Sequence, residues 1–178
     1  PYRQAPKANV ESTHHHYQQN LVEFDHISCP AVAHVRVAVG VLVPYFSYEE
    51  RLESRKIWKT YFQNHHRTIT LRQVFVIGTP QDEHVQLVQE ESKNFGDILI
   101  TTCADSHLEL ACKTSTFIQG VGAMSGAYDL IAKTDIDTLL NPYELEKFVH
   151  KISGCPMSYI GIKKFHDRVQ HHGSKYPE

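Results

Sequence analysis

Two hydrophobic periods alternate along most of this chain. From Val35 the run VRVAVGVLV is almost continuously apolar and rich in β-branched residues, which is typical of a strand buried on both faces. A segment with helical period follows it, and the alternation of strand and helix then repeats. The expected strands are 35–43, 71–77, 97–101, 128–134 and 157–162, and the expected helices are 47–62, 82–95, 108–124 and 142–151. This order predicts an α/β fold with a mostly parallel sheet and helices on both faces.

The chain is expected to hold one folded domain. Residues 1–34 are polar and follow neither period, so they predict an irregular leader, and residues 35–178 predict a single domain without linkers or repeats. In that leader, His14, His15 and His16 are adjacent, which favours a solvated loop over a metal site.

Composition narrows the function classes. Hydrophobic residues make up 41% and charged residues 21%, and the net charge of −2 gives no basic excess for a nucleic-acid partner. The sequence has neither a transmembrane run nor a signal-peptide pattern. Because it begins at Pro1 rather than Met, we expect a fragment or processed chain, and an upstream anchor stays possible. The cysteines, which are Cys29, Cys103, Cys112 and Cys155, lack zinc-cluster spacing and leave disulfides and buried free thiols equally open.

Two carboxylates follow the strand expected at 128–134. Side chains alternate along extended backbone, so Asp135 and Asp137 can project to one side while Ile136 turns into the core. In parallel sheets, ligands bind outside the carboxyl ends of the strands. The pair therefore predicts a site for Mg²⁺ or Mn²⁺, which prefer carboxylate oxygens together with substrate phosphates.

Three cations recur on the first expected helix. Arg51, Arg55 and Lys59 are spaced i, i+4, i+8 and share one helix face. Two interpretations stay open. The row is a solvated stripe that pairs with nearby glutamates, or it is a pocket for a diphosphate, whose oxygens suit the guanidinium fork.

Several stretches together resemble one family. RLESRKIW (51–58) is similar to its arginine-rich helix signature, VFVIG (74–78) to its second-strand signature, and EESKNFGDILITTCADSHLELACKT (90–114) to its longest motif. KTDID (133–137) is similar to its Lys-Thr-Asp-Asp-Asp metal motif. The family is that of the β-1,3-galactosyl- and N-acetylglucosaminyltransferases, glycosyltransferase family 31, with its fringe-like and core-1 relatives. The resemblance spans roughly residues 36–178.

The sequence departs from the family pattern at three positions. Ile136 replaces the middle aspartate, His107 stands where the family usually has tyrosine, and Lys59 replaces a glycine. The outer aspartates are present, so the departures concern specificity more than reaction class.

The resemblance implies a GT-A nucleotide-diphospho-sugar transferase fold, C-terminally truncated. It implies an inverting, metal-assisted transfer of galactose or N-acetylhexosamine from a UDP-sugar to the 3-hydroxyl of an acceptor glycan on a glycoprotein or glycolipid. Asp135 and Asp137 would bind Mn²⁺ or Mg²⁺. The donor site would comprise Arg51, Arg55, Asp105, Lys113 and Asp135. The location implied is the Golgi or ER lumen, behind an N-terminal membrane anchor that this chain lacks.

The general base is expected beyond Glu178, with Asp167 the first candidate inside the chain. The fragment alone is then expected to bind the donor but to be inactive. The main alternative is a catalytically silent relative that acts as a chaperone or nucleotide-sugar-binding module. A kinase or phosphatase is less favoured because the sequence has no phosphate-binding glycine loop.

Overall fold

The structure, a computed structural model, describes residues 33–62, 68–138 and 140–155. The elements in chain order are β1 (Val35–Leu42), α1 (Tyr48–Phe62), β2 (Ile69–Ile77), α2 (Asp82–Phe95), β3 (Ile98–Ile100), the short 3₁₀ helix η1 (His107–Glu109), α3 (Leu110–Ala123), β4 (Leu130–Asp135) and α4 (Pro142–Ile152). Nearly all of the expected leader, including its three histidines, and the strand expected at 157–162 lie outside the described residues.

The sheet is parallel, and β1 is one of its two central strands. Its strand order is β3-β2-β1-β4, and every ladder between these strands is parallel. All residues of β1 except Arg36 are buried, as the continuous apolar run predicted. The predicted α/β fold with a parallel sheet is therefore confirmed for the part of the chain described.

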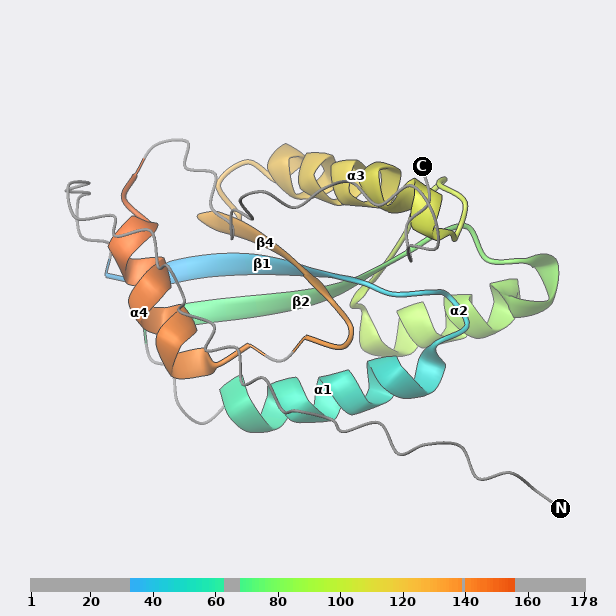
Figure 1. Cartoon of the computed structure of the whole chain (residues 1–178), viewed down its shortest axis with the longest axis horizontal. Helices are drawn as coiled ribbons and strands as arrows, with labels where there is room; N and C mark the ends of the chain where they lie inside the picture. The colour runs from blue at the N-terminus through green and yellow to red at the C-terminus, as the bar shows by residue number, and fades with distance from the viewer. Residues whose placement is uncertain (1–32, 63–67, 139, 156–178) are drawn as a thin grey trace, which may run out of the picture.

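Helices cover both faces of this sheet. On one face α3 contributes Phe117 and Val121 to a core with Ala38, Leu42 and Val76. The side chains of β1 that point the other way pack against α1, α2 and α4, in two clusters that include Trp58, Val88 and Val149. Figure 1 shows α3 on one side of the strands and α1 and α2 on the other.

The approach of α3 to the sheet depends on a glycine in β1. A Cβ atom built at Gly40 would lie 2.5 Å from two ring carbons of Phe117, a distance that real contacts essentially never show. Phe117 is completely buried. The ring therefore occupies the volume that a side chain at position 40 would need.

Helix ends follow the local sequence signals. Gly96 ends α2 in the left-handed conformation at φ 63°, and its N–H donates to the Ser92 carbonyl. Asn141 caps α4, because its side-chain oxygen accepts hydrogen bonds from the N–H groups of Tyr143 and Glu144. The helix expected at 108–124 differs slightly, since a 3₁₀ turn at His107–Glu109 precedes α3.

None of the described helices combines the length and the apolar character that crossing a bilayer requires.

Candidate functional site

The carboxyl ends of the strands meet at one edge of the sheet. Leu42, the last residue of β1, is in register with Asp135, the last residue of β4, and Val76 of β2 pairs with Leu42 on the other side. The loops that follow these strands therefore lie together. This edge is where ligands bind in parallel sheets.

The two aspartates after β4 take the orientation expected from their spacing. Asp135 and Asp137 are exposed, whereas Ile136 is half-buried and packs against the cluster that contains Val41 and Phe75. Lys133, two residues before Asp135 on the same face of the strand, places its Nζ 3.0 Å from Asp135 Oδ1. The carboxylates thus point to solvent while the residue between them belongs to the core.

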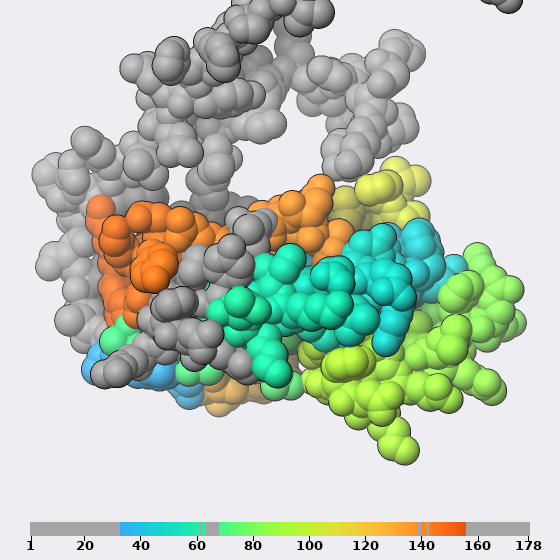
Figure 2. All heavy atoms as spheres, turned by 90° about the horizontal axis from the view of Figure 1, so that it is seen from below, coloured from blue at the N-terminus to red at the C-terminus, as the bar shows by residue number. Residues whose placement is uncertain are grey.

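A cavity lies between α1 and the chain that follows β4. Its volume is about 570 Å³, and Asp137 lines it together with Glu49, Glu50 and Glu53 from the first half of α1. Asp135 is not among its lining residues. Figure 2 shows the chain just after β4, in orange, packed against α1, in teal. Within the described residues, no three carboxylates around Asp137 bring their oxygens close enough together to form a preformed cation site, so metal binding by Asp135 and Asp137 stays a prediction.

Arg51 is buried and fully engaged with other protein groups. Its side chain is 1% exposed, and its Nε and Nη2 donate to the two carboxylate oxygens of Glu91 at 3.0 and 2.6 Å. Its Nη1 donates to the Pro44 carbonyl at 2.8 Å, and Nη2 also donates to the Tyr45 carbonyl at 3.0 Å. Arg51 therefore joins α1 both to α2 and to the loop after β1. Its predicted contact with the donor stays a prediction.

Arg55, one turn further along α1, joins the same network. It donates through Nε and Nη2 to Asp97 at 2.8 Å each, and its Nη2 lies 2.8 Å from Glu91 Oε1. Its guanidinium stacks 3.9 Å from the ring centre of Phe95. The interpretation as a solvated stripe is thus wrong for the two arginines. They pair with Glu91 of α2 and with Asp97, which follows the cap of α2, rather than with glutamates on their own helix. Donor binding by Arg55 remains a prediction.

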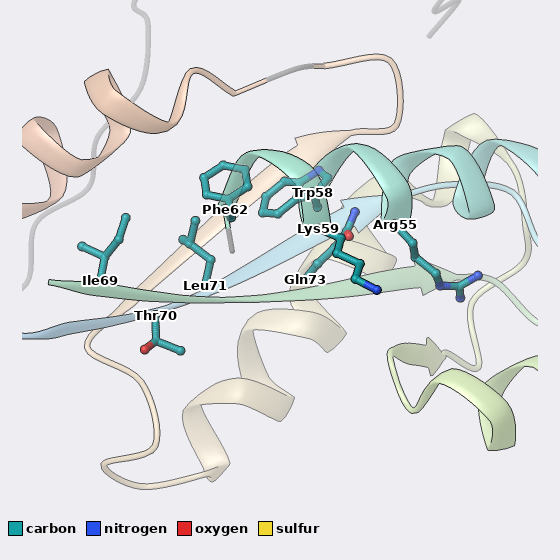
Figure 3. A pocket seen from close by; sticks show the side chains of 8 residues that line it. All are labelled: Arg55, Trp58, Lys59, Phe62, Ile69, Thr70, Leu71 and Gln73. Carbon is teal, nitrogen blue, oxygen red and sulfur yellow. The ribbon is translucent and has the colours of Figure 1, made fainter. Parts of the chain in front are cut away.

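Lys59, the third cation of this helix face, lines a second cavity together with Arg55. This cavity has a volume of about 390 Å³ and is enclosed by the second half of α1 and the first half of β2. Figure 3 shows Trp58 and Phe62 of α1 on the side of β2 where Leu71 lies, whereas Thr70 points to the other side. Trp58 is 8% exposed and stacks on Phe62 with ring centres 4.7 Å apart. Lys59 is exposed at the rim.

The charge network holds Glu91 ionised. Burial raises the pKa of its carboxyl, but hydrogen bonds from Arg51 and Arg55, reinforced by their charges, outweigh burial and leave the pKa below its usual range. Sequence reasoning missed Glu91 and Asp97 as partners. Both lie inside the stretch 90–114 that resembles the longest family motif, so that motif was the available signal.

Asp105 and Lys113 form a second buried ion pair at the same edge. Lys113 Nζ donates to Asp105 Oδ1 at 2.7 Å, and the two side chains are 5% and 3% exposed. The N–H of Gly78 also donates to Oδ1 at 3.3 Å, and the N–H of Tyr45 donates to Oδ2 at 2.6 Å. The structure therefore brings these two predicted donor residues together. Whether they touch a donor stays a prediction.

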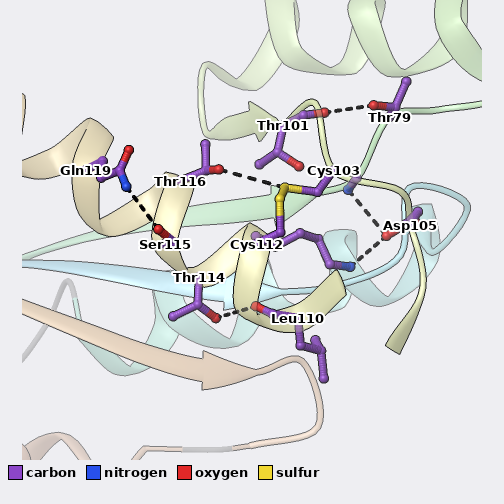
Figure 4. The surroundings of a disulfide bond; sticks show 12 residues. Thr79, Thr101, Cys103, Asp105, Leu110, Cys112, Thr114, Ser115, Thr116 and Gln119 are labelled. Atoms are coloured by element: carbon purple, nitrogen blue, oxygen red, sulfur yellow. Dashed lines mark hydrogen bonds and ion pairs between the residues drawn. A yellow bond between two sulfur atoms is a disulfide. The ribbon is translucent and has the colours of Figure 1, made fainter. Parts of the chain in front are cut away.

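A disulfide closes the segment that contains Asp105. Cys103 and Cys112 are bonded to each other, which settles for this pair the alternative that the sequence left open. Cys155 is also disulfide-bonded. Glu109 lies close enough to both sulfurs to complete a three-ligand metal group, but the sulfurs bind each other instead. Figure 4 shows the disulfide beside Asp105.

Comparison with known proteins agrees with the resemblance of the motifs. The family model described as galactosyltransferase matches residues 50–175. Beta-1,3-galactosyltransferase 1 from Mus musculus and from Homo sapiens are each 26% identical to this chain over 145 residues. That alignment covers 73% of this chain and 44% of either relative, so the chain spans less than half the length of the relatives it matches. Since the family model covers most of the domain, this chain belongs to the galactosyltransferase family.

Proposed function

We propose that this chain supplies the donor-binding part of an inverting hexosyltransferase. The reaction transfers galactose or N-acetylhexosamine from a UDP-sugar to the 3-hydroxyl of an acceptor glycan. The observation that supports this best is the position of the two exposed aspartates at the carboxyl end of β4, in a chain of the galactosyltransferase family.

The proposed donor site has a metal at its centre. Asp135 and Asp137 bind Mn²⁺ or Mg²⁺ through carboxylate oxygens, and such a metal, when bound, neutralises charge on a departing diphosphate. Asp137 shares its cavity with three glutamates, of which Glu53 is paired with Lys56. A nucleotide diphosphate would meet repulsion there without a cation, and we therefore expect nucleotide affinity to depend on the metal.

The proposed location is the lumen of the secretory pathway, in the Golgi or ER, with anchoring to the membrane by a segment outside this sequence. The disulfide between Cys103 and Cys112 supports this location, because disulfides persist in oxidising compartments and are rare in the cytosol. The relatives are named beta-1,3-galactosyltransferase 1, and we extend the β-1,3 linkage to this chain as part of the proposal.

Calorimetric titration with UDP tests the proposal. We expect the parent chain to bind UDP in the presence of Mn²⁺ and to lose most of that affinity in EDTA. Asp137→Asn should abolish the metal-dependent part of binding. Its effect on stability should stay within about 0.5 kcal/mol, because Asp137 is exposed.

Asp82→Asn provides the matched control. Asp82 is also exposed, but it lies in the first turn of α2. This variant should bind UDP and Mn²⁺ like the parent. Equal UDP affinity in Asp137→Asn and the parent would refute the metal assignment. No UDP binding by the parent under any metal condition would refute the proposal and favour a chaperone role or a different ligand.

A further inference from the structure

The loop that follows β1 is held at both backbone polar groups of one residue, Tyr45. The N–H of Tyr45 donates to Asp105 Oδ2 at 2.6 Å, and the carbonyl of Tyr45 accepts from Arg51 Nη2 at 3.0 Å. Both of these charged side chains are almost completely buried. The position of this loop therefore depends on two side chains from other parts of the fold.

Asp105 also holds the neighbouring loop, which follows β2. Its Oδ1 accepts from the N–H of Gly78 as well as from Lys113 Nζ. The fit is close, since a Cβ atom built at Gly78 would lie 2.6 Å from Asp105 Cα. The carboxylate of Asp105 thus accepts hydrogen bonds from the loop after β1, from the loop after β2 and from α3. These are the loops at the edge where the donor site is proposed.

The burial of Asp105 limits how it can act. Its side chain is 3% exposed, and each of its oxygens already accepts a hydrogen bond from the protein. A sugar-nucleotide donor could reach this carboxylate only by displacing the groups that bury it, and displacing Lys113 would leave an uncompensated charge. Asp105 is therefore suited to orienting the loops rather than to touching a ligand.

The two bonded cysteines lie close in sequence to the two members of the ion pair, Asp105 and Lys113. Cys103 lies two residues before Asp105, and Cys112 directly precedes Lys113. The N–H of Thr79, next to Gly78, donates to the Cys103 carbonyl at 2.8 Å. In Figure 4 the disulfide links the connection that carries Asp105, between β3 and α3, to the first turn of α3.

We propose that Asp105 is a positioning residue for the donor site and that the Cys103–Cys112 disulfide keeps it in place. This inference rests on the proposed function. Reduction by a dithiol would transfer two electrons and two protons to the sulfurs, giving two thiols and a cyclic disulfide of the reductant. The ring that closes around Asp105 would open, and nucleotide affinity would fall.

The first measurement is UDP affinity with Mn²⁺ for Asp105→Asn, Lys113→Met and the double variant. Each single variant should bind at least about tenfold more weakly, as expected when a charge-assisted hydrogen bond that orders the loops is lost. The double variant should be no weaker than the weaker single variant, because the two side chains act as one unit. Lys113→Arg, which keeps the charge, should recover most of the affinity. Additive losses in the double variant would mean separate donor contacts and would overturn the proposal.

Two readouts separate positioning from a loss of structure. Binding of Mn²⁺ alone, measured by electron paramagnetic resonance, should be unchanged in Asp105→Asn, because the proposed metal ligands are Asp135 at the end of β4 and Asp137 just after it. Amide hydrogen exchange should accelerate at Tyr45 and Gly78 but not in the centre of β1. Unaltered exchange at both amides, or unaltered UDP affinity beside a parent that binds, would refute the proposal.

The disulfide is tested with a double serine variant, Cys103→Ser with Cys112→Ser. Compared with the parent, this variant should bind UDP more weakly and show faster amide hydrogen exchange at Tyr45 without any reductant. Dithiothreitol should weaken binding by the parent but have no further effect on this variant, which controls for reduction of other disulfides. A parent-like serine variant would overturn the role of the disulfide. Absence of UDP binding by the parent itself would refute the proposed function, and the positioning role of Asp105 with it.

Discussion

Replacing Glu91 with alanine is expected to destabilise the fold by about 3–5 kcal/mol, the usual cost of removing one partner of a buried ion pair. Glu91 Oε2 lies 2.6 Å from Arg51 Nη2, and Oε1 lies 2.8 Å from Arg55 Nη2. Arg55 keeps its carboxylate partner Asp97, whereas Arg51 keeps two backbone carbonyls that carry no compensating charge. Most of the cost therefore arises from the guanidinium of Arg51. This loss is a large share of the roughly 5–15 kcal/mol that stabilises a typical domain.

Urea unfolding provides the assay, since Trp58 is the single tryptophan of the chain and is buried in the core. Glu90→Ala is the matched control, because Glu90 precedes Glu91 on α2 and is exposed. It should change the free energy of unfolding by no more than about 0.5 kcal/mol. Glu91→Gln should fall between the two, since the amide keeps an acceptor but loses the charge. A Glu91→Ala variant as stable as Glu90→Ala would refute the argument that Arg51 is desolvated.

Acidic pH should remove the contribution of Glu91 to the stability of the fold. Its pKa in the folded state is lowered, so the stability it provides is present above the pKa of the unfolded chain, about 4.3. That stability is lost as the pH falls through the lowered pKa of the folded state. The difference in unfolding free energy between the parent and Glu91→Gln should therefore be full at pH 7 and shrink below about pH 4. A difference that stays constant down to pH 2.5 would contradict this linkage.

The remaining predictions concern packing on the two faces of the sheet, and both are measured by chemical unfolding. Gly40→Ala should destabilise by about 1–3 kcal/mol, because the added methyl overlaps the ring of Phe117. Gly120→Ala, in open space on α3, should instead be neutral or stabilise by up to about 1 kcal/mol, and equal effects of the two would contradict the predicted overlap. Trp58→Ala should cost about 3–5 kcal/mol, whereas Ile57→Ala, at a side chain 39% exposed, should cost much less.

The sequence was sufficient to predict the helices and strands that carry a local signal, such as a periodic pattern of apolar residues or a capping residue. The apolar run of β1 and the glycine after α2 are local signals, and both had the consequences expected of them. The partners of the arginines are not local. Arg51 and Glu91 are 40 positions apart, and no period in either helix indicates which carboxylate meets which guanidinium. The pairing of Cys103 with Cys112 was open for the same reason, since a count of cysteines does not specify distances.

The structure shows where the three residues that depart from the family pattern lie relative to the proposed site. Ile136 stands between the two aspartates, and its side chain packs against buried residues of β1 and β2 while its neighbours face solvent. An isoleucine suits this half-buried position, which packs against the core. His107 and Lys59 are exposed. The departures therefore do not remove the groups that the proposed metal needs, and differences in ligand preference would have to arise from surface contacts at positions such as these.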